Sequence, residues 1–269
     1  MNCLLKTLSL NAIKTLFAKH KSKTDARYSS ISIKKDVIVA TDGNDSTADG
    51  SEERPFATIQ AALDFLGEGC ISCTIRIKAG TYTYERICIE YKHSVYITSY
   101  SGNCDVNLIM VGDRGFEIRQ NLQVSLSHIK ILFSSTSSDP NVQWSSCAII
   151  VDGASMLYMS DVDIILQNAG LCINNQGVVN IDGTRFGFTY EKGTGKQCGI
   201  QSHYASISFI NVVSCKVYTS KDSEIYHEPY YGWRSYGGII LCKDKFWGES
   251  AANLTSSTGE IRWVNQYNS

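Results

Sequence analysis

The feature that most constrains the fold of this 269-residue sequence is a repeat of short apolar-polar alternations between about residues 87 and 219. Each unit has an apolar-x-apolar-x-apolar frame, then a turn-forming residue, then a second short alternation. Four equivalent quartets recur at intervals of 22 to 33 residues: LSHI (126–129), MSDV (159–162), IDGT (181–184) and FINV (209–212). Alternation of this kind marks half-buried strands, and a fixed repeat marks stacked architectures. About 22 residues suffice for one coil of three short strands and three turns.

The repeat therefore predicts an all-β solenoid whose successive coils pair in parallel and stack their inward apolar side chains. The frame places five residues in inward positions: Ile129, Leu157, Val162, Ile181 and Phe209. Corner positions between strands fall on His128, Asp161, Gly183 and Asn211. Asp, Asn and Gly suit corners because they tolerate left-handed backbone angles or hydrogen-bond their own turn. The polar runs 134–146 and 189–197 are expected to be insertions that project from the solenoid.

Two helical patterns precede the repeat. Residues 1–27 predict an amphipathic helix with Leu5, Leu8, Ile13 and Leu16 on one face. This face either packs on the end of the solenoid or serves as a self-associating or docking arm. Residues 56–66 predict a helix that covers the first coil and ends at Gly67.

The repeat fades after residue 219, where tyrosine and tryptophan become frequent. A solenoid needs a terminal cap to cover its last coil, and an aromatic C-terminal cap would serve. The expected organisation is an arm at 1–35, a β-helix at 36–220 that includes the capping helix, and a cap or tip at 221–269.

Bulk charge and composition exclude several classes of partner. The formal net charge is −1 and only 19% of residues are charged, so we expect neither nucleic-acid binding nor attraction to an acidic membrane. No run of about 18 apolar residues predicts membrane insertion, and no signal peptide is recognisable, so synthesis in a cytoplasm is expected. The ten cysteines are expected to be buried reduced thiols without a disulfide framework. No metal site and no cofactor are predicted.

Three segments then give a resemblance: VATDGND (39–45), RPFATIQAA (54–62) and IRIKAGTY (75–82). Together they resemble the opening of pectate-lyase-like right-handed parallel β-helices, and most closely that of bacteriophage tail spike and tail fibre proteins. The resemblance implies a virion tail protein made in the host cytoplasm and assembled as a homotrimer. It also implies that residues 1–35 bind other tail proteins and that the chain meets a host cell-surface polysaccharide.

Candidate site residues follow from two kinds of chemistry. Glycoside hydrolysis needs two carboxylates on one surface, for which the candidates are Asp161 and Asp163, with Asp182 and Glu117 as further members. The calcium-binding and arginine set of pectate lyases and the motifs of pectin methylesterases are not recognisable. A noncatalytic alternative is a sugar-stacking platform of Tyr230, Tyr231, Trp233 and Tyr236; the same residues would also suit a buried cap or a subunit interface.

Attachment to a host surface glycan is therefore the expected function. Two alternatives stay open: a polysaccharide depolymerase, either glycoside hydrolase or lyase, on the same β-helix, and a purely structural virion component. Opening motifs like those at 39–45, 54–62 and 75–82 occur both in enzymes and in adhesins. The fold alone therefore does not decide between these functions.

Overall fold

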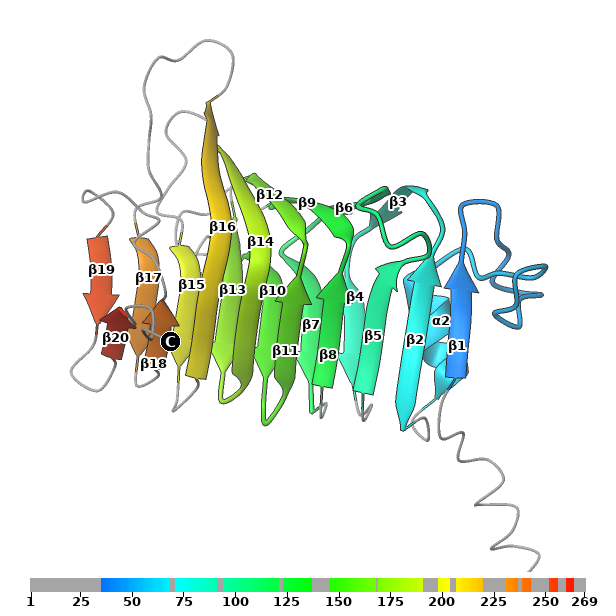
Figure 1. Ribbon diagram of the computed structural model, residues 1–269, viewed down its shortest axis with the longest axis horizontal. Coiled ribbons are helices and arrows are strands. Elements are labelled where there is room, and N and C mark those ends of the chain that lie inside the picture. Colours follow the sequence, from blue (N-terminus) through cyan, green and yellow to red (C-terminus); the bar gives the residue numbers. More distant parts are fainter. Residues whose placement is uncertain are drawn as a thin grey trace, which may run out of the picture.

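The computed structural model describes residues 35–67, 71–90, 94–120, 123–136, 146–167, 169–190, 198–203, 207–219, 231–236, 239–242, 252–255 and 260–263. For the described residues among 170–173 and from 182 onward, it describes the backbone but not the side chains. Every strand pair in this part of the chain is parallel, and the coils stack into an elongated parallel β-helix (Figure 1). The repeat thus predicted the correct fold class.

The strands fall into three columns, one for each side of the coil. The first column contains β1 (Lys35–Val39), β2 (Ser72–Ile77), β5 (Ser94–Ser99), β8 (Gln123–Ser127), β11 (Met156–Ser160), the first halves of β14 (Val178–Tyr190) and β16 (Ile207–Thr219), β18 (Ile239–Cys242) and β20 (Glu260–Trp263). The second column contains β3 (Gly80–Tyr84), β6 (Val106–Val111), β9 (Ile129–Ser134), β12 (Asp163–Gln167) and the second halves of β14 and β16.

The third column forms a separate seven-stranded sheet. It contains β4 (Ile87–Glu90), β7 (Arg114–Arg119), β10 (Cys147–Asp152), β13 (Gly170–Asn175), β15 (Cys198–His203), β17 (Tyr231–Tyr236) and β19 (Ala252–Thr255). Because β14 and β16 run through the corner between the first two columns, those columns join into one thirteen-stranded sheet.

Alternation along each strand builds one continuous core. Apolar side chains point inward from every column and are almost fully buried, and the core cluster runs from Val37 in the first coil to Ile181. The predicted inward residues Ile129, Leu157, Val162 and Ile181 are all buried in it.

A short helix, α2 (Ile59–Leu66), covers the first coil. It buries Ile59, Ala62, Leu63 and Leu66 against the solenoid, as the sequence predicted for 56–66. The helix begins three residues later than predicted because Phe56 instead forms a parallel bridge with Val39.

The corner prediction is confirmed at His128 and Asp161 but not at Gly183 and Asn211, which lie inside β14 and β16. His128 and Asp161 have φ angles of 54° and 52°, the left-handed conformation expected at a corner. Gly183 instead lies inside β14, where the register with β16 is irregular between Asp182 and Thr184.

That irregularity also changes the alignment of the backbone around Phe209, one of the expected core residues. Ile181 pairs with Ile210, whereas Phe209 pairs with Asn180, so the register in this part of the coil differs by one residue from the predicted alignment. Thr184 pairs with Val212, as the alignment of the quartets predicted. The predicted register is therefore correct at the end of the quartet and one residue off at its start. The side chain of Phe209 lies outside the described part of the structure, so its inward position stays a prediction.

The ladder also continues beyond the boundary predicted at residue 220. Strands β17, β18, β19 and β20 pair in parallel with preceding coils, so the region 221–269 contributes strands to both sheets. Aromatic residues and glycines replace the aliphatic alternation here, which hid these strands. The predicted arm at 1–27 lies outside the described residues.

One cysteine departs from expectation. Cys73 is disulfide-bonded to a residue whose side chain lies outside the described set, so it is not a buried reduced thiol. Cys88, Cys104 and Cys147 form no disulfide. In the described part of the chain, no helix has the length and apolar character needed to cross a membrane.

Candidate functional site

The outer face of the third column carries the densest cluster of charged contacts among the described residues, and it centres on Glu117. On β7, Phe116 and Ile118 point into the core, so alternation turns Glu117 to the outer face. Its side chain is nevertheless fully buried, at 0% exposure. A buried carboxylate is stable only when it is paired and hydrogen-bonded.

Three arginines supply that pairing. Glu117 Oε1 accepts from Arg114 Nη1 at 2.9 Å, while Oε2 lies 3.1 Å from Arg119 Nη2 and 3.5 Å from Arg86 Nη1. Arg114 and Arg119 belong to the same strand, whereas Arg86 precedes β4 in the neighbouring coil. Both carboxylate oxygens are therefore engaged by guanidinium groups from two coils.

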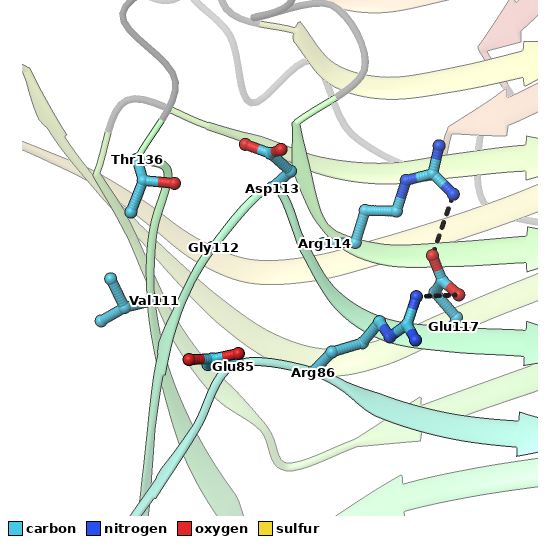
Figure 2. Close-up of a pocket in the computed structure, with 8 residues that line it drawn as sticks. All are labelled: Glu85, Arg86, Val111, Gly112, Asp113, Arg114, Glu117 and Thr136. Carbon is cyan, nitrogen blue, oxygen red and sulfur yellow. Dashed lines mark hydrogen bonds and ion pairs between the residues drawn. The ribbon is translucent and has the colours of Figure 1, made fainter.

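A pocket of about 590 Å³ opens beside this cluster. Its wall contains residues from three successive coils, as Figure 2 shows: Glu85 and Arg86, then Val111, Gly112, Asp113, Arg114 and Glu117, then Thr136. These residues lie mainly at the corner where the second column passes into the third. A Cβ at Gly112 would lie 3.1 Å from the carbonyl oxygen of Glu85, so glycine here permits neighbouring turns to approach closely.

The pocket wall offers both donors and acceptors. Arg86 and Arg114 extend toward Glu117, and Glu85 and Asp113 lie on either side of Gly112 (Figure 2). The contacts of Arg86 and Arg114 with Glu117 each use one nitrogen of a guanidinium group that carries five N–H donors. The exposed carboxylates of Glu85 and Asp113 are acceptors. Such a wall can hydrogen-bond a polyhydroxylated ligand.

A polar ladder continues the cluster along the same face. Glu90, Arg119, Asp152 and Asn175 occupy paired positions in four successive coils. Arg119 Nη1 donates to Glu90 at 3.0 Å, its Nε lies 3.8 Å from Asp152 Oδ2, and Asn175 Nδ2 donates to Asp152 Oδ1 at 2.7 Å. Burial alone would lower the pKa of Arg119, but the Glu117 charge and the hydrogen bond to Glu90 raise it.

Cys88 lies at the edge of this cluster and is not an activated thiol. Burial, followed by the hydrogen bond to Glu90 and the nearby carboxylate charges, raises its pKa to about 11. A thiol with so high a pKa is a poor nucleophile near neutral pH, because the thiolate is the reactive form.

The four predicted catalytic candidates do not meet at one site. Glu117 lies on the seven-stranded sheet, whereas Asp163 and Asp182 lie in β12 and β14 of the other sheet. Asp161 occupies the corner before β12, 3.9 Å from His128 Nε2. Asp161 and Asp163 therefore do not lie on one strand, because the left-handed corner at Asp161 comes before β12.

The predicted sugar platform is described only in part. Tyr230 lies outside the described residues, and Tyr231, Trp233 and Tyr236 lie in β17. Trp233 pairs with Ile200, which continues the register of Cys172, Ile149 and Phe116; the last two are core residues. The side chains of Tyr231, Trp233 and Tyr236 lie outside the described part of the structure.

Apart from Glu117, the residues of the pocket were missed at the sequence level, although a signal was present. A dipeptide of an acidic residue and arginine occurs where two successive strands of the third column begin. It is Glu85-Arg86 directly before β4, and Asp113-Arg114 at the start of β7. A repeated charged dipeptide at one corner of a solenoid marks side chains that stack from coil to coil. Within the described residues, no group of three or more His, Cys, Asp or Glu side chains is arranged to hold a metal ion.

Comparison with known proteins adds little to this geometry. No family model matches the chain, and no curated protein matches it. A solved structure of a rhamnogalacturonan lyase aligns over 86% of this chain and 85% of that chain, at 9% identity and a TM-score of 0.31. The assignment to a parallel β-helix rests on the strand pairing itself, and the function has to be argued from the pocket.

Proposed function

We propose that this chain is a tail spike or tail fibre type protein of a bacteriophage virion that attaches to a glycan on the host surface. The observation that carries the proposal is the pocket of about 590 Å³ beside Glu117, with arginine donors and carboxylate acceptors on one wall. Its volume lies in the range of about 300–1,000 Å³ that is typical of small-molecule sites. The opening motifs at 39–82 support the phage context.

The pocket favours binding over chemistry at Glu117. Both oxygens of this carboxylate contact guanidinium groups, and the side chain is fully buried, so it has no open position for a sugar carbon. Its role is to hold arginines in place. Charge-assisted contacts of this kind fix donor directions before a ligand arrives, and preorganisation lowers the entropic cost of binding.

The resemblance of residues 39–82 to tail spike and tail fibre proteins also implies where the protein is made and what it assembles with. The protein would be made in the host cytoplasm, form a homotrimer and join the virion tail through residues 1–35. It would bind the host polysaccharide, with no role in nucleic-acid binding or membrane insertion.

Binding of the full-length protein to immobilised bacterial surface polysaccharides tests the proposal. Arg114→Ala should lower the affinity at least tenfold, because it removes both a pocket donor and the 2.9 Å contact to Glu117. Arg76→Ala is the matched control, since Arg76 pairs with Asp36 on the first column, away from the pocket. Absence of binding across a broad polysaccharide panel would reject attachment to a glycan.

A depolymerase is the second candidate, favoured by one specific observation. Glu85 and Asp113 are two exposed carboxylates that line the same pocket, and glycoside hydrolysis uses a pair of carboxyl groups across the scissile bond. Release of reducing ends from a bound polysaccharide would support this candidate. The activity should then disappear in both Glu85→Gln and Asp113→Asn while binding persists.

A further inference from the structure

We propose that the pocket beside Glu117 selects an uncharged oligosaccharide, which lies across three coils along the solenoid axis, and rejects uronate and other anionic sugars. This inference rests on the proposed glycan attachment and names the ligand class of the same pocket. It follows from the charge of the pocket wall, from its extent along the axis and from the way in which Glu117 fixes the arginines.

The charges on the pocket wall determine the preference for neutral over anionic sugars. Two arginines and three carboxylates line the pocket, so its formal charge is negative although it contains arginine. The charges of Arg86 and Arg114 are already directed at the buried Glu117. Glu117 offsets part of their charge and also pairs with Arg119. An anionic sugar would in addition meet the exposed carboxylates of Glu85 and Asp113, and like charges brought together cost affinity.

Neutral sugar hydroxyls fit the same wall without this penalty. A hydroxyl group both donates and accepts, so one sugar can donate to Glu85 or Asp113 and accept from Arg86 or Arg114. Thr136 adds a further hydroxyl from the third coil. A set of donors and acceptors at fixed positions recognises a pattern of hydroxyl groups rather than a net charge.

The extent of the pocket sets the ligand length and direction. Glu85, Asp113 and Thr136 belong to three successive coils. Neighbouring strands lie about 4.8 Å apart, so the wall extends about 10 Å along the solenoid axis. That distance accommodates about two sugar rings end to end, whereas a chain that followed the strands would contact a single coil.

Glu117 acts as a positioning residue for this selectivity. It is fully buried and contacts Arg114 at 2.9 Å and Arg86 at 3.5 Å. It both orients the guanidinium groups and offsets part of their positive charge. Replacing Glu117 by glutamine keeps the shape of the side chain but removes its charge, which would leave both arginines able to attract an anion.

Calorimetric titration of the full chain with two matched series tests the inference. The neutral series consists of linear hexose oligomers from one to six units, and the anionic series consists of uronate oligomers of the same lengths. Neutral ligands should bind at least tenfold more tightly than uronates. Their affinity should rise from one to two or three units and then level off.

Variants test whether the pocket sets this preference. Glu85→Gln should reduce the preference for neutral ligands at least threefold, whereas Glu53→Gln, which makes the same charge change at an exposed position outside the pocket, should leave it unchanged. Glu117→Gln should weaken the binding of neutral ligands and strengthen that of uronates. Thermal unfolding monitors folding in each variant, and a reversal of charge preference cannot arise from a simple loss of folded protein.

The outcomes separate the two proposals. If neither series binds and no surface polysaccharide binds either, glycan attachment fails and the inference fails with it. If glycans bind but uronates bind as tightly as neutral oligomers, attachment stands and the inference is overturned. The inference is also overturned if binding is unchanged in both Arg114→Ala and Glu85→Gln, because the glycan then occupies another surface.

Discussion

At the scale of single residues, Glu117 is the polar group on which the outer face of the third column depends. Replacing it by alanine should lower the free energy of unfolding by about 2–3 kcal/mol, because hydrogen bonds to charged groups contribute about 1.5–3 kcal/mol each and the partly exposed arginines can regain water. The cost should exceed that of Asp36→Ala, whose pair with Arg76 is largely exposed and contributes at most about 1 kcal/mol. Urea unfolding midpoints measure both. Equal losses would show that the buried cluster adds no more than a surface ion pair.

Residue-level prediction from sequence worked where alternation alone decides the outcome. Ile129, Leu157, Val162 and Ile181 are buried as predicted, since the period of two assigns each to the inner face. The burial of Glu117 could not be derived in this way. It depends on Arg86 in the neighbouring coil as well as on Arg114 and Arg119, and alternation predicts only an outer-face position for it.

At the scale of elements, the cap of α2 depends on a residue well before the helix. The Asp45 carboxylate accepts from the backbone nitrogens of Ala57 and Thr58 at 2.7 and 3.0 Å and from Thr58 Oγ1 at 2.8 Å. Thr58 is itself the N-cap and accepts from Ala61 N. Asp45→Ala should therefore cost about 1–2 kcal/mol, the usual scale for a lost helix cap. Chemical unfolding measures the change, with the exposed Glu53→Ala as control; a similar small effect of both would contradict the role of Asp45.

Strand β3 should make the protein sensitive to alkaline pH. Burial, with a smaller contribution from nearby Asp42, raises the pKa of Tyr82 to about 12, and burial likewise raises the pKa of Tyr84 to about 12. The ordinary value is 10.0, so the folded state disfavours the ionised phenols. Their stabilising contribution is complete below about pH 10 and is lost as pH rises toward about 12. The thermal midpoint should fall across this interval.

Replacing Tyr82 by phenylalanine separates that alkaline effect from packing. The variant loses the hydrogen bond from the Tyr82 hydroxyl to the Lys78 carbonyl at 2.8 Å, so it should be less stable at pH 7. Its midpoint should nevertheless fall less steeply between pH 10 and 12, because one titrating group is gone. An unchanged slope would assign the alkaline transition to other groups.

The elements also show why sequence located the capping helix but not the pocket. The apolar spacing of Ile59, Ala62, Leu63 and Leu66 is a local signal, and the structure confirms it. Residues Glu85 and Asp113 come together only because consecutive coils stack at one corner. Without the coil register, which insertions of variable length obscure, their repeated dipeptides could not be aligned.

At the scale of the whole molecule, the proposed homotrimer gives a direct measurement. The outer face of the first column carries Tyr96 and Tyr158, each 37% exposed, beside hydroxyl side chains such as Ser125, with which both tyrosines pair in register. Aromatic rings beside neutral hydroxyl groups suit association between copies. Light scattering should give three times the chain mass of 29.8 kDa, and Tyr158→Lys should lower it. A monomer at micromolar concentration would contradict the trimer.

Removing residues 1–30 tests whether the N-terminal segment is an attachment arm or part of the solenoid end. The described core cluster begins at Val37, and the first coil is closed by the pairing of β1 with β2 and by the packing of α2. None of these contacts needs a residue before Lys35, so the truncated protein should keep its β-sheet circular dichroism and its thermal midpoint within about 2 °C. It should also keep its affinity for the glycan, since the pocket lies between Glu85 and Thr136. Incorporation into virions should be lost, because the proposed contact with other tail proteins is removed. A midpoint lowered by more than about 5 °C, a shift that about 2 kcal/mol can produce in a protein of this size, would show instead that the segment packs on the end of the solenoid.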